Sequence, residues 1–586
     1  MIRILEIIDF NFCSMVKIIS HLKKKILIAI SLLAIFFLAI IVWYSPIIFK
    51  GYPTQTISKE MILAKNYAKT GVLANENNLN ITLAPSLIRK EGHPLVMSEY
   101  LGSFFYAQIF KIIGLPDYNN LILFSVILYA LILVLFTILT LYLFNFKIAI
   151  VFSLIYIFSP VGWGLPRYLG SYEFCLIFWA LFFVFYFLGV KRTEQSKNKF
   201  NNLFFIISGI FLALSGLSKE VSFIFALAFF IFLLVRKLKQ QLMYVFIPFI
   251  ILIIIFWLPS VISGQNRYIS LSNSQAKEES IFSVYLHVFP DPYTYYFEKE
   301  EFLEKFREED LGWSENLETK KVLTNFGFDK PGIIDRFRVG IYILSQHFFR
   351  FFSLEDIGGP FIAMLLILGM VYLRNKYKFL YKLALYWLAI SFLVFAFIIL
   401  ASRNHLMDFI WLLSLLTALG LFYLIYIIKE HFKLEGKILT LFGVLITALV
   451  LYHLILVNHV VLGKEYDKDF VPRSMVYARE IKELEISDAD VIAIPSDFSN
   501  QINTLNYLTD KSFVIFRAPT LERLLKEGEI KNAFEAFKVR YILGYPDQLS
   551  KEIIKQTPVI NIASSSIKIE LEQVSESKSF FMNLIR

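Results

Sequence analysis

The sequence predicts a polytopic α-helical membrane protein that ends in a small extracytoplasmic α/β domain. Long apolar spans alternate with short loops, 57% of the residues are hydrophobic and 17% are aromatic, and the mean hydropathy is +0.61. Spans of roughly 15 to 25 apolar residues are long enough to cross the hydrocarbon core of a bilayer. After the last span, the pattern changes to short β-rich runs that alternate with helical stretches. Such alternation is typical of an α/β layer domain.

The apolar spans predict about eleven transmembrane helices. They lie near residues 26–49, 121–145, 148–163, 174–190, 203–218, 221–235, 242–262, 360–373, 383–401, 410–428 and 438–461. Clusters of Lys and Arg fill every second loop, and loops rich in these residues face the cytoplasm. An odd number of crossings puts the two termini on opposite sides. We therefore expect a multi-pass protein of the plasma (cell) membrane with a cytoplasmic N-terminus and an extracytoplasmic C-terminus.

The composition also excludes some classes of protein. The formal net charge is +10, but much of the Lys and Arg excess lies in the predicted cytoplasmic turns, so it does not indicate nucleic-acid binding. The apolar stretch 26–49 is too long for a signal peptide and is expected to stay as an anchor. Cys13 and Cys175, the two cysteines, predict no disulfide framework.

Two long segments, 50–120 and 263–359, are expected to face the extracytoplasmic compartment. The first carries helical apolar spacing from Ile57 to Ala68 and again around Tyr100 to Ile113, which predicts helices along the membrane surface. The predicted domains are a membrane domain, 1–461, and an extracytoplasmic α/β domain, 462–586.

The C-terminal domain is predicted from strands and helices in alternation. Strands are expected at 490–494, 512–516 and 539–543, and helices at 472–485, 499–508 and 519–536. No Gly-rich phosphate loop follows any of these strands, so the sequence assigns this domain no nucleotide chemistry.

Charged residues gather at the predicted outer ends of the spans, where they are candidates for a functional site. Carboxylates beside cations at one membrane face suit the transfer of a group from an anionic lipid carrier, because a carboxylate accepts a proton and Lys or Arg holds a phosphate. The candidates are Glu60, Arg167 with Glu173, Lys219 with Glu220, and Arg403 with His405.

Each candidate also has a purely structural interpretation. Lys219 and Glu220 could form the turn of a helical hairpin, and Arg403 and His405 could contact lipid headgroups. Glu60 could be a solvated residue of an amphipathic helix. The sequence leaves these interpretations open.

The residues resemble a known family, the polytopic GT-C glycosyltransferases, in the group that contains protein O-mannosyltransferases and lipid A aminoarabinose transferases. The resemblance covers most of the membrane domain. Its features are the long first outer loop with an amphipathic helix, the Pro-containing stretch 91–95, the small-residue span from Gly209 to Lys219, and the Arg-containing turn 402–407.

The resemblance implies a GT-C-like fold and a sugar donor linked to a polyprenyl or dolichyl phosphate, with a protein, lipid or glycan as acceptor. In the family an acidic residue opens the helix of the first outer loop and is taken to be the catalytic base. Here the equivalent stretch, 55–57, has no acid, and Glu60 is the nearest substitute. Glu173 is similar to a second acid of some members. The resemblance then implies displacement at the anomeric carbon of the sugar, with no metal or other cofactor. The catalytic carboxylates would be Glu60 and Glu173. The cations that bind the donor phosphate would be Arg167, Lys219, Arg403 and His405.

Two other classes stay open. A lipid or glycan transporter would also be polytopic with charges near the membrane, although the sequence shows no paired repeats of the kind common in transporters. A non-catalytic surface-assembly protein is the other alternative, and the absence of an acid at 55–57 favours it. Substitution of Glu60, Glu173 and Lys219 would discriminate, because only an enzyme would lose transfer activity.

Overall fold

The computed structural model of the protein contains two compact units. The first unit comprises Met1–Asn75, Ile88–Pro290 and Ser314–Pro472, and the second comprises Glu76–Leu87, Asp291–Trp313 and Arg473–Arg586. Apart from isolated positions at 31–38, 337–353 and 397, the structure describes residues 59–71, 81–82, 101–159, 172–195, 201–219, 221–262, 357–394, 409–464, 473–483, 486–487, 490–495, 502–516, 518–557 and 561–562. Most of the predicted span 26–49 lies outside these residues, as does 263–336.

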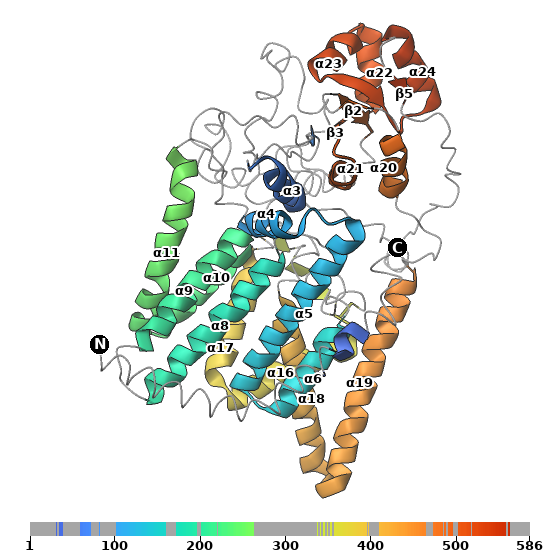
Figure 1. Cartoon of the computed structure of the whole chain (residues 1–586). Helices are drawn as coiled ribbons and strands as arrows, with labels where there is room; N and C mark the ends of the chain where they lie inside the picture. Colours follow the sequence, from blue (N-terminus) through green and yellow to red (C-terminus); the bar gives the residue numbers. More distant parts are fainter. Residues whose placement is uncertain are drawn as a thin grey trace. The chain divides into compact units, whose positions relative to one another are not determined.

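The first unit is a bundle of apolar helices (Figure 1). In chain order they are α5 (Tyr118–Leu143), α6 (Phe146–Phe158), α8 (Tyr172–Gln195), α9 (Asn201–Ser218), α10 (Val221–Val235), α11 (Lys239–Ile262), α16 (Pro360–Lys376), α17 (Lys378–Val394), α18 (Ile410–Phe432) and α19 (Gly436–Lys464). Polar caps begin two of them, because the Asp117 carboxylate accepts from Asn120 N and the Asn145 side chain accepts from Ile148 N.

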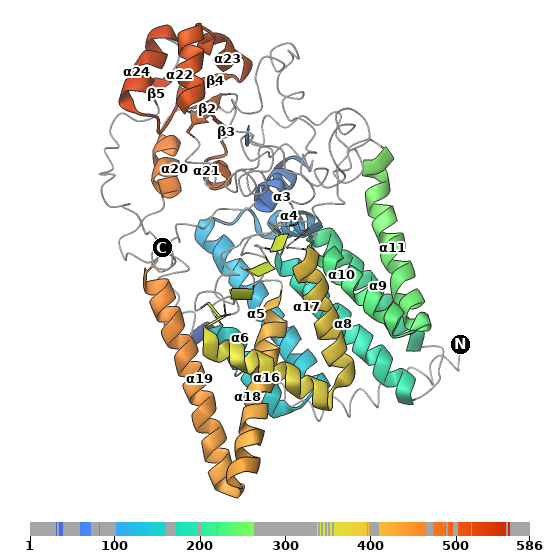
Figure 2. The ribbon, with the colours of Figure 1, turned by 180° about the vertical axis from the view of Figure 1, so that it is seen from behind.

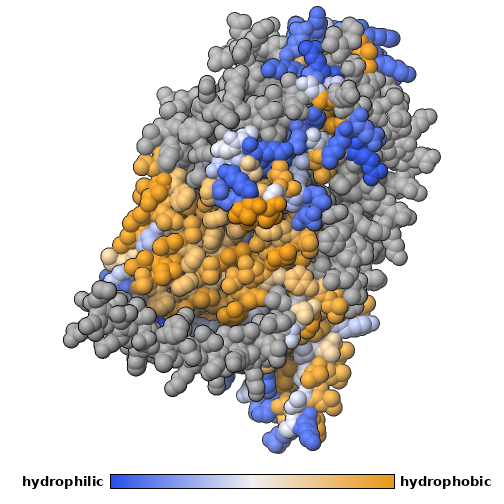
Figure 3. All heavy atoms as spheres, in the orientation of Figure 1, coloured by the Kyte–Doolittle hydropathy of each residue, from blue (hydrophilic) through white to orange (hydrophobic). Residues whose placement is uncertain are grey.

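Five helices in the described part of the chain are long and apolar enough to cross a membrane. They are Asn120–Leu143, Tyr172–Thr193, Lys239–Leu258, Ile410–Phe432 and Gly436–Val457. Large apolar side chains stay exposed on one side of α5, at Leu123, Ile127 and Leu131, which are spaced by one helical turn. Figure 3 shows apolar side chains over the face of the helix bundle. Helices of this kind place the protein in a membrane.

Glycines allow α16 and α18 to approach closely, and Figure 2 shows these helices from behind. A Cβ added to Gly369 would collide with the carbonyl of Leu416, and one added to Gly420 would collide with the carbonyl of Leu365. Small residues at helix crossings are a common device of membrane bundles, since they let the backbones touch. The contact therefore requires glycine on both helices.

Two further helices, α3 (Lys59–Thr70) and α4 (Leu101–Ile113), come from the predicted outer segment 50–120 and pack against each other. The Tyr67 and Phe104 rings lie 5.8 Å apart, and Lys111 Nζ lies 4.2 Å from the centroid of the Tyr67 ring. Phe105 of α4 stacks on Phe174 of α8 at 5.1 Å. Aromatic contacts thus hold α4 on the beginning of α8.

The second unit contains a five-stranded sheet in the order β1-β3-β2-β4-β5. The strands are β1 (Ile81–Thr82), β2 (Val491–Ile494), β3 (Ser512–Ile515), β4 (Val539–Ile542) and β5 (Asn561–Ile562). Strand β2 pairs in parallel with β3 and β4, and β4 with β5, whereas β1 is antiparallel to β3. A strand from the first outer segment therefore joins a sheet whose other strands follow the last span.

Helices cover both faces of this sheet. They are α20 (Arg473–Glu483), α21 (Ile502–Thr509), α22 (Ala518–Glu527), α23 (Ile530–Ala536) and α24 (Asp547–Gln556). Because side chains alternate along a strand, Val491 and Ala493 of β2 pack with α22, α23 and α24, while Ile492 and Ile494 pack with α20 and α21. The single helix expected at 519–536 is two helices, separated at Gly528, whose φ is +72°.

Candidate functional site

The candidate site begins with an ion pair between two of the sequence-predicted residues. Lys219 Nζ lies 3.7 Å from Glu60 Oε1. Glu60 is in the first turn of α3, where a helix dipole favours a carboxylate. The side chains of Lys219 and Glu60 keep 22% and 18% of their surface exposed, so a ligand can reach both.

Lys219 occupies the turn of a tight helical hairpin. Its backbone N–H donates to the carbonyl of Ser215, which closes the last turn of α9. Its carbonyl accepts from the N–H of Ser222, in the first turn of α10. The Lys219 backbone thus ends one helix and begins the next, while its side chain reaches Glu60, which precedes it by 159 residues in the sequence.

Tyr172, the first residue of α8, contacts the same lysine. Lys219 Nζ lies 4.9 Å from the centroid of the Tyr172 ring, within the range of a cation–π interaction. One helical turn later, Cys175 Sγ of α8 and Ser222 Oγ of α10 lie 2.9 Å apart, at hydrogen-bond distance. Cys175 is a free, buried thiol. The first turns of α8 therefore contact both the Lys219 turn and the beginning of α10.

Glu173 lies next to this contact but in a different environment. It is 0% exposed, and its Oε1 accepts a 2.8 Å hydrogen bond from the Ser125 hydroxyl of α5. A sugar at the protein surface cannot contact a carboxylate with this burial. The structure therefore separates the two predicted acids: Glu60 is reachable, whereas Glu173 is an internal contact between α5 and α8.

Tyr106 of α4 is a residue of this region that the sequence did not single out. Burial, and then the nearby negative charge of Glu173, hold the pKa of its phenol well above the usual range; Glu60 contributes in the same direction. Tyr106 also contacts Phe174 edge-on at 5.1 Å. The aromatic run of 100–113 signalled only a surface helix, because no spacing rule relates it to acids at positions 60 and 173.

Three predicted site residues lie outside the part of the chain that the structure describes: Arg167, Arg403 and His405. Glu220 lies outside it as well. Among the residues that are described, no group of three His, Cys, Asp or Glu side chains gathers as a metal site. The described site therefore consists of Glu60, Lys219 and Tyr172, with Tyr106 and Glu173 behind them.

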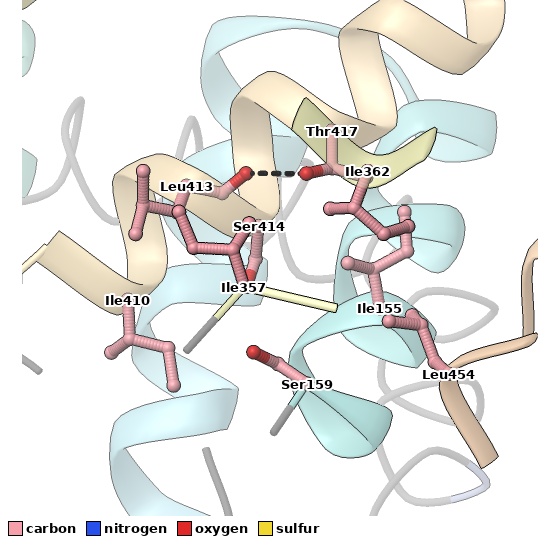
Figure 4. Close-up of a pocket in the computed structure, with 9 residues that line it drawn as sticks. All are labelled: Ile155, Ser159, Ile357, Ile362, Ile410, Leu413, Ser414, Thr417 and Leu454. Atoms are coloured by element: carbon pink, nitrogen blue, oxygen red, sulfur yellow. Dashed lines mark hydrogen bonds between the residues drawn. The ribbon is translucent and has the colours of Figure 1, made fainter. Parts of the chain in front are cut away.

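A small hollow lies elsewhere in the bundle, between α6, α16, α18 and α19 (Figure 4). It has about 10 Å³ of free space, roughly the room that one water molecule needs. Thr417 donates to the carbonyl of Leu413 in its own helix, so its hydroxyl is already used. The lining is aliphatic apart from three hydroxyls, and it holds no charged side chain; it consists of Ile155, Ser159, Ile357, Ile362, Ile410, Leu413, Ser414, Thr417 and Leu454. It is not a site for a phosphate.

Comparison with known sequences returns nothing: no protein-family profile matches the chain, and no curated protein matches it. Solved structures do match. The apo oligosaccharyltransferase of Archaeoglobus fulgidus superposes with a TM-score of 0.50 at 15% identity, covering 88% of this chain and 69% of that one.

Two further structures have lower scores. The oligosaccharyltransferase AglB from Archaeoglobus fulgidus, in complex with an inhibitory peptide and a dolichol-phosphate, has a TM-score of 0.49 at 13% identity and covers 89% of this chain and 69% of that one. ArnT from Cupriavidus metallidurans in the apo state has a TM-score of 0.48 at 10% identity, and the match covers 90% of this chain and 88% of that one. The match at 0.50 shows that the chain shares the fold of this archaeal membrane oligosaccharyltransferase.

Proposed function

We propose that the protein is a membrane glycosyltransferase that moves a sugar from a polyprenyl-phosphate-linked donor to a protein, lipid or glycan acceptor at the extracytoplasmic face. The observation that carries the proposal is the reachable pair of Glu60 and Lys219, whose charged atoms lie 3.7 Å apart. One group can accept a proton and the other can bind a phosphate, and the two are side by side.

The proposed reaction is a displacement at the anomeric carbon of the donor sugar. A nucleophilic atom of the acceptor forms a bond to that carbon while the bond from the carbon to the phosphate oxygen breaks. The acceptor's proton passes to the Glu60 carboxylate, and the lipid phosphate leaves with both electrons of the broken bond. Lys219 stabilises the negative charge that develops on this phosphate. Arg167, Arg403 and His405 would extend the cationic side of the site.

Glu173 takes a different part in this proposal. Its carboxylate accepts from Ser125 and is 0% exposed, so it acts from behind the site instead of on the sugar. Its hydrogen bond joins α5 to α8, and the neighbouring Phe174 contacts Tyr106 of α4, the helix that packs on α3. The reacting carboxylate is thus Glu60, and Glu173 keeps in place the helices on which the site is built.

The proposed topology has eleven crossings, with the C-terminal α/β domain, 462–586, on the extracytoplasmic side. Sequence parity puts the segment 50–120 and the turn after 203–218 on the same outer face. The Glu60–Lys219 contact joins those two segments, which supports this assignment. A donor in the outer leaflet would reach the pair laterally from the bilayer.

The test is transfer from radiolabelled polyprenyl-phosphate sugars in membranes that carry the wild-type protein, Glu60→Gln or Glu430→Gln. Glu430 is an exposed carboxylate near the end of α18 and serves as the control. We expect a loss of about 100-fold or more for Glu60→Gln, as for removal of a general base, and an unchanged rate for the control. Full activity of Glu60→Gln would overturn the assignment. An inert wild type across donors and acceptors would favour a non-catalytic surface-assembly protein.

A further inference from the structure

We infer that Tyr172 is a positioning residue for the donor phosphate, because its ring holds the Lys219 ammonium in place and leaves its positive charge available. This inference rests on the proposed function, in which Lys219 binds the phosphate of the lipid carrier. It adds a residue that charge and spacing in the sequence did not identify, since Tyr172 is one of 31 tyrosines in the chain.

Within the described part of the chain, the Lys219 ammonium contacts groups of two different kinds. Lys219 Nζ lies 4.9 Å from the Tyr172 ring centroid and 3.7 Å from Glu60 Oε1. An aromatic face attracts a cation through its quadrupole but carries no net charge. A second carboxylate in that place would hold the lysine equally well and would repel an incoming phosphate. The ring restrains the cation without that repulsion.

The Tyr172–Lys219 contact is fixed by a second contact in the same register. Tyr172 and Cys175 are three residues apart on α8, and Lys219 and Ser222 are three residues apart across the hairpin turn. Cys175 Sγ and Ser222 Oγ lie 2.9 Å apart and are buried. Residues three apart on a helix share a face, so Tyr172 and Cys175 present one face of α8, which contacts Lys219 in the turn and Ser222 at the beginning of α10.

Hydrogen bonds also restrain the chain next to Tyr172 and at Lys219. Glu173, directly after Tyr172, is held by the 2.8 Å hydrogen bond from Ser125. Lys219 uses its own N–H and carbonyl in the hydrogen bonds that end α9 and begin α10. A long lysine side chain loses conformational entropy when it is ordered, so a preformed ring contact reduces the entropy that phosphate binding must still remove.

The chain contains a matched control for this arrangement. Lys111 Nζ lies 4.2 Å from the centroid of the Tyr67 ring, where α3 and α4 pack together. This is the same kind of contact at a different lysine. Substitutions of Tyr172 should change the environment of Lys219 and leave that of Lys111 as it is, and substitutions of Tyr67 should do the reverse.

The first experiment measures how strongly the Tyr172 ring restrains the Lys219 ammonium when no substrate is present. The full-length protein in lipid nanodiscs is treated with an amine-acylating reagent, and the rates at Lys219 and Lys111 are compared by mass spectrometry. Tyr172→Leu should accelerate acylation of Lys219 by about threefold to tenfold, as expected for the loss of a cation–π contact, while Tyr172→Phe should not. Tyr67→Leu should accelerate acylation of Lys111 alone. Equal Lys219 rates in Tyr172→Leu and Tyr172→Phe would overturn the inference.

The second experiment measures binding of a polyprenyl monophosphate and, for comparison, of the polyprenyl alcohol. Tyr172→Leu should weaken binding of the phosphate by about threefold to tenfold and leave binding of the alcohol unchanged, and Tyr172→Phe should bind as the wild type does. A Leu variant with wild-type phosphate affinity would contradict the role of Tyr172. If the wild type binds phosphate and alcohol alike, the phosphate site itself is wrong, and the proposed function fails at Lys219 independently of the acylation result.

Discussion

The Ser125 hydroxyl donates a 2.8 Å hydrogen bond to the Glu173 carboxylate and so joins the N-terminal parts of α5 and α8 inside the protein. Both side chains are 0% exposed. A buried carboxylate needs such donors, because leaving it short of a partner costs its desolvation free energy. This contact is the basis for proposing that Glu173 acts through the packing of α5 and α8 and not on the sugar.

Ser125→Ala should therefore lower stability. We expect the free energy of unfolding to fall by about 1–2 kcal/mol, because a buried charge-assisted hydrogen bond is lost. Thermal unfolding in detergent compares this variant with Ser208→Ala. Ser208 is equally buried, but its hydroxyl bonds only to the carbonyl of Phe205 in its own helix. Equal losses in the two variants would show that the Glu173 contact has no special weight.

Gly420→Ala should disrupt the crossing of α16 and α18. The new Cβ would collide with the carbonyl of Leu365, and backbone cannot move aside as a flexible side chain does. We expect a loss of about 2 kcal/mol or more in the free energy of unfolding, as for overpacking. Gly443→Ala on α19 is the control, since its nearest contact would be 3.6 Å away. A Gly420→Ala variant as stable as the control would contradict the close crossing.

Tyr545 in the C-terminal unit should make stability depend on alkaline pH. Its hydroxyl donates to the carbonyl of Phe516, and burial raises the pKa of the phenol well above the usual range. The raised value means that the unfolded chain ionises first, at about pH 10, so the contribution is complete below pH 10 and is lost as the pH rises further. Hydrogen exchange of β3 and β4 in the full chain, corrected for intrinsic rates, should show this loss in the wild type and less of it in Tyr545→Phe. The control is Tyr541→Phe, on β4, which should behave as the wild type.

The predicted orientation can be tested by cysteine labelling in a background with Cys13→Ser and Cys175→Ser. A membrane-impermeant maleimide added to intact cells should label Glu527→Cys in the C-terminal unit. It should label Glu430→Cys, at the end of α18, only after the membrane is opened. Both carboxylates are exposed, so accessibility within the protein does not separate them. If Glu430→Cys is labelled in intact cells and Glu527→Cys only after the membrane is opened, the orientation is the opposite of the predicted one.

Apolar length predicted the long helices of the bundle well, because a continuous apolar run is a strong local signal; five of the described helices are long enough to cross a membrane. The helices α5 and α18 begin and end within a few residues of the expected spans 121–145 and 410–428. The close crossing of α16 and α18 could not be predicted from the sequence, because it depends on which helices meet. There Gly369 lies against Leu416, and Gly420 lies against Leu365.

The candidate site shows the same division. Charge at the end of a span identified Lys219 and Glu60, yet no local rule pairs residues so far apart in the chain. The pairing of β1 with β3 was missed for the same reason, because Ile81–Thr82 is too short to be recognised as a strand. Tyr172 and Tyr106 acquire their roles only from the packing of α8, α9 and α4 around them.

The most direct test of the central claim is the transfer rate of Glu60→Gln, Lys219→Gln and the double variant in proteoliposomes. If both residues act in one reaction, the double variant should lose about as much activity as the worse single variant, because groups that work as a unit are not additive. Glu60→Gln should lower kcat. Lys219→Gln should raise the KM for the lipid-linked donor and also lower kcat, because Lys219 both binds the donor phosphate and stabilises the charge that develops on it. Wild-type rates in both single variants would contradict the claim that this pair performs the transfer.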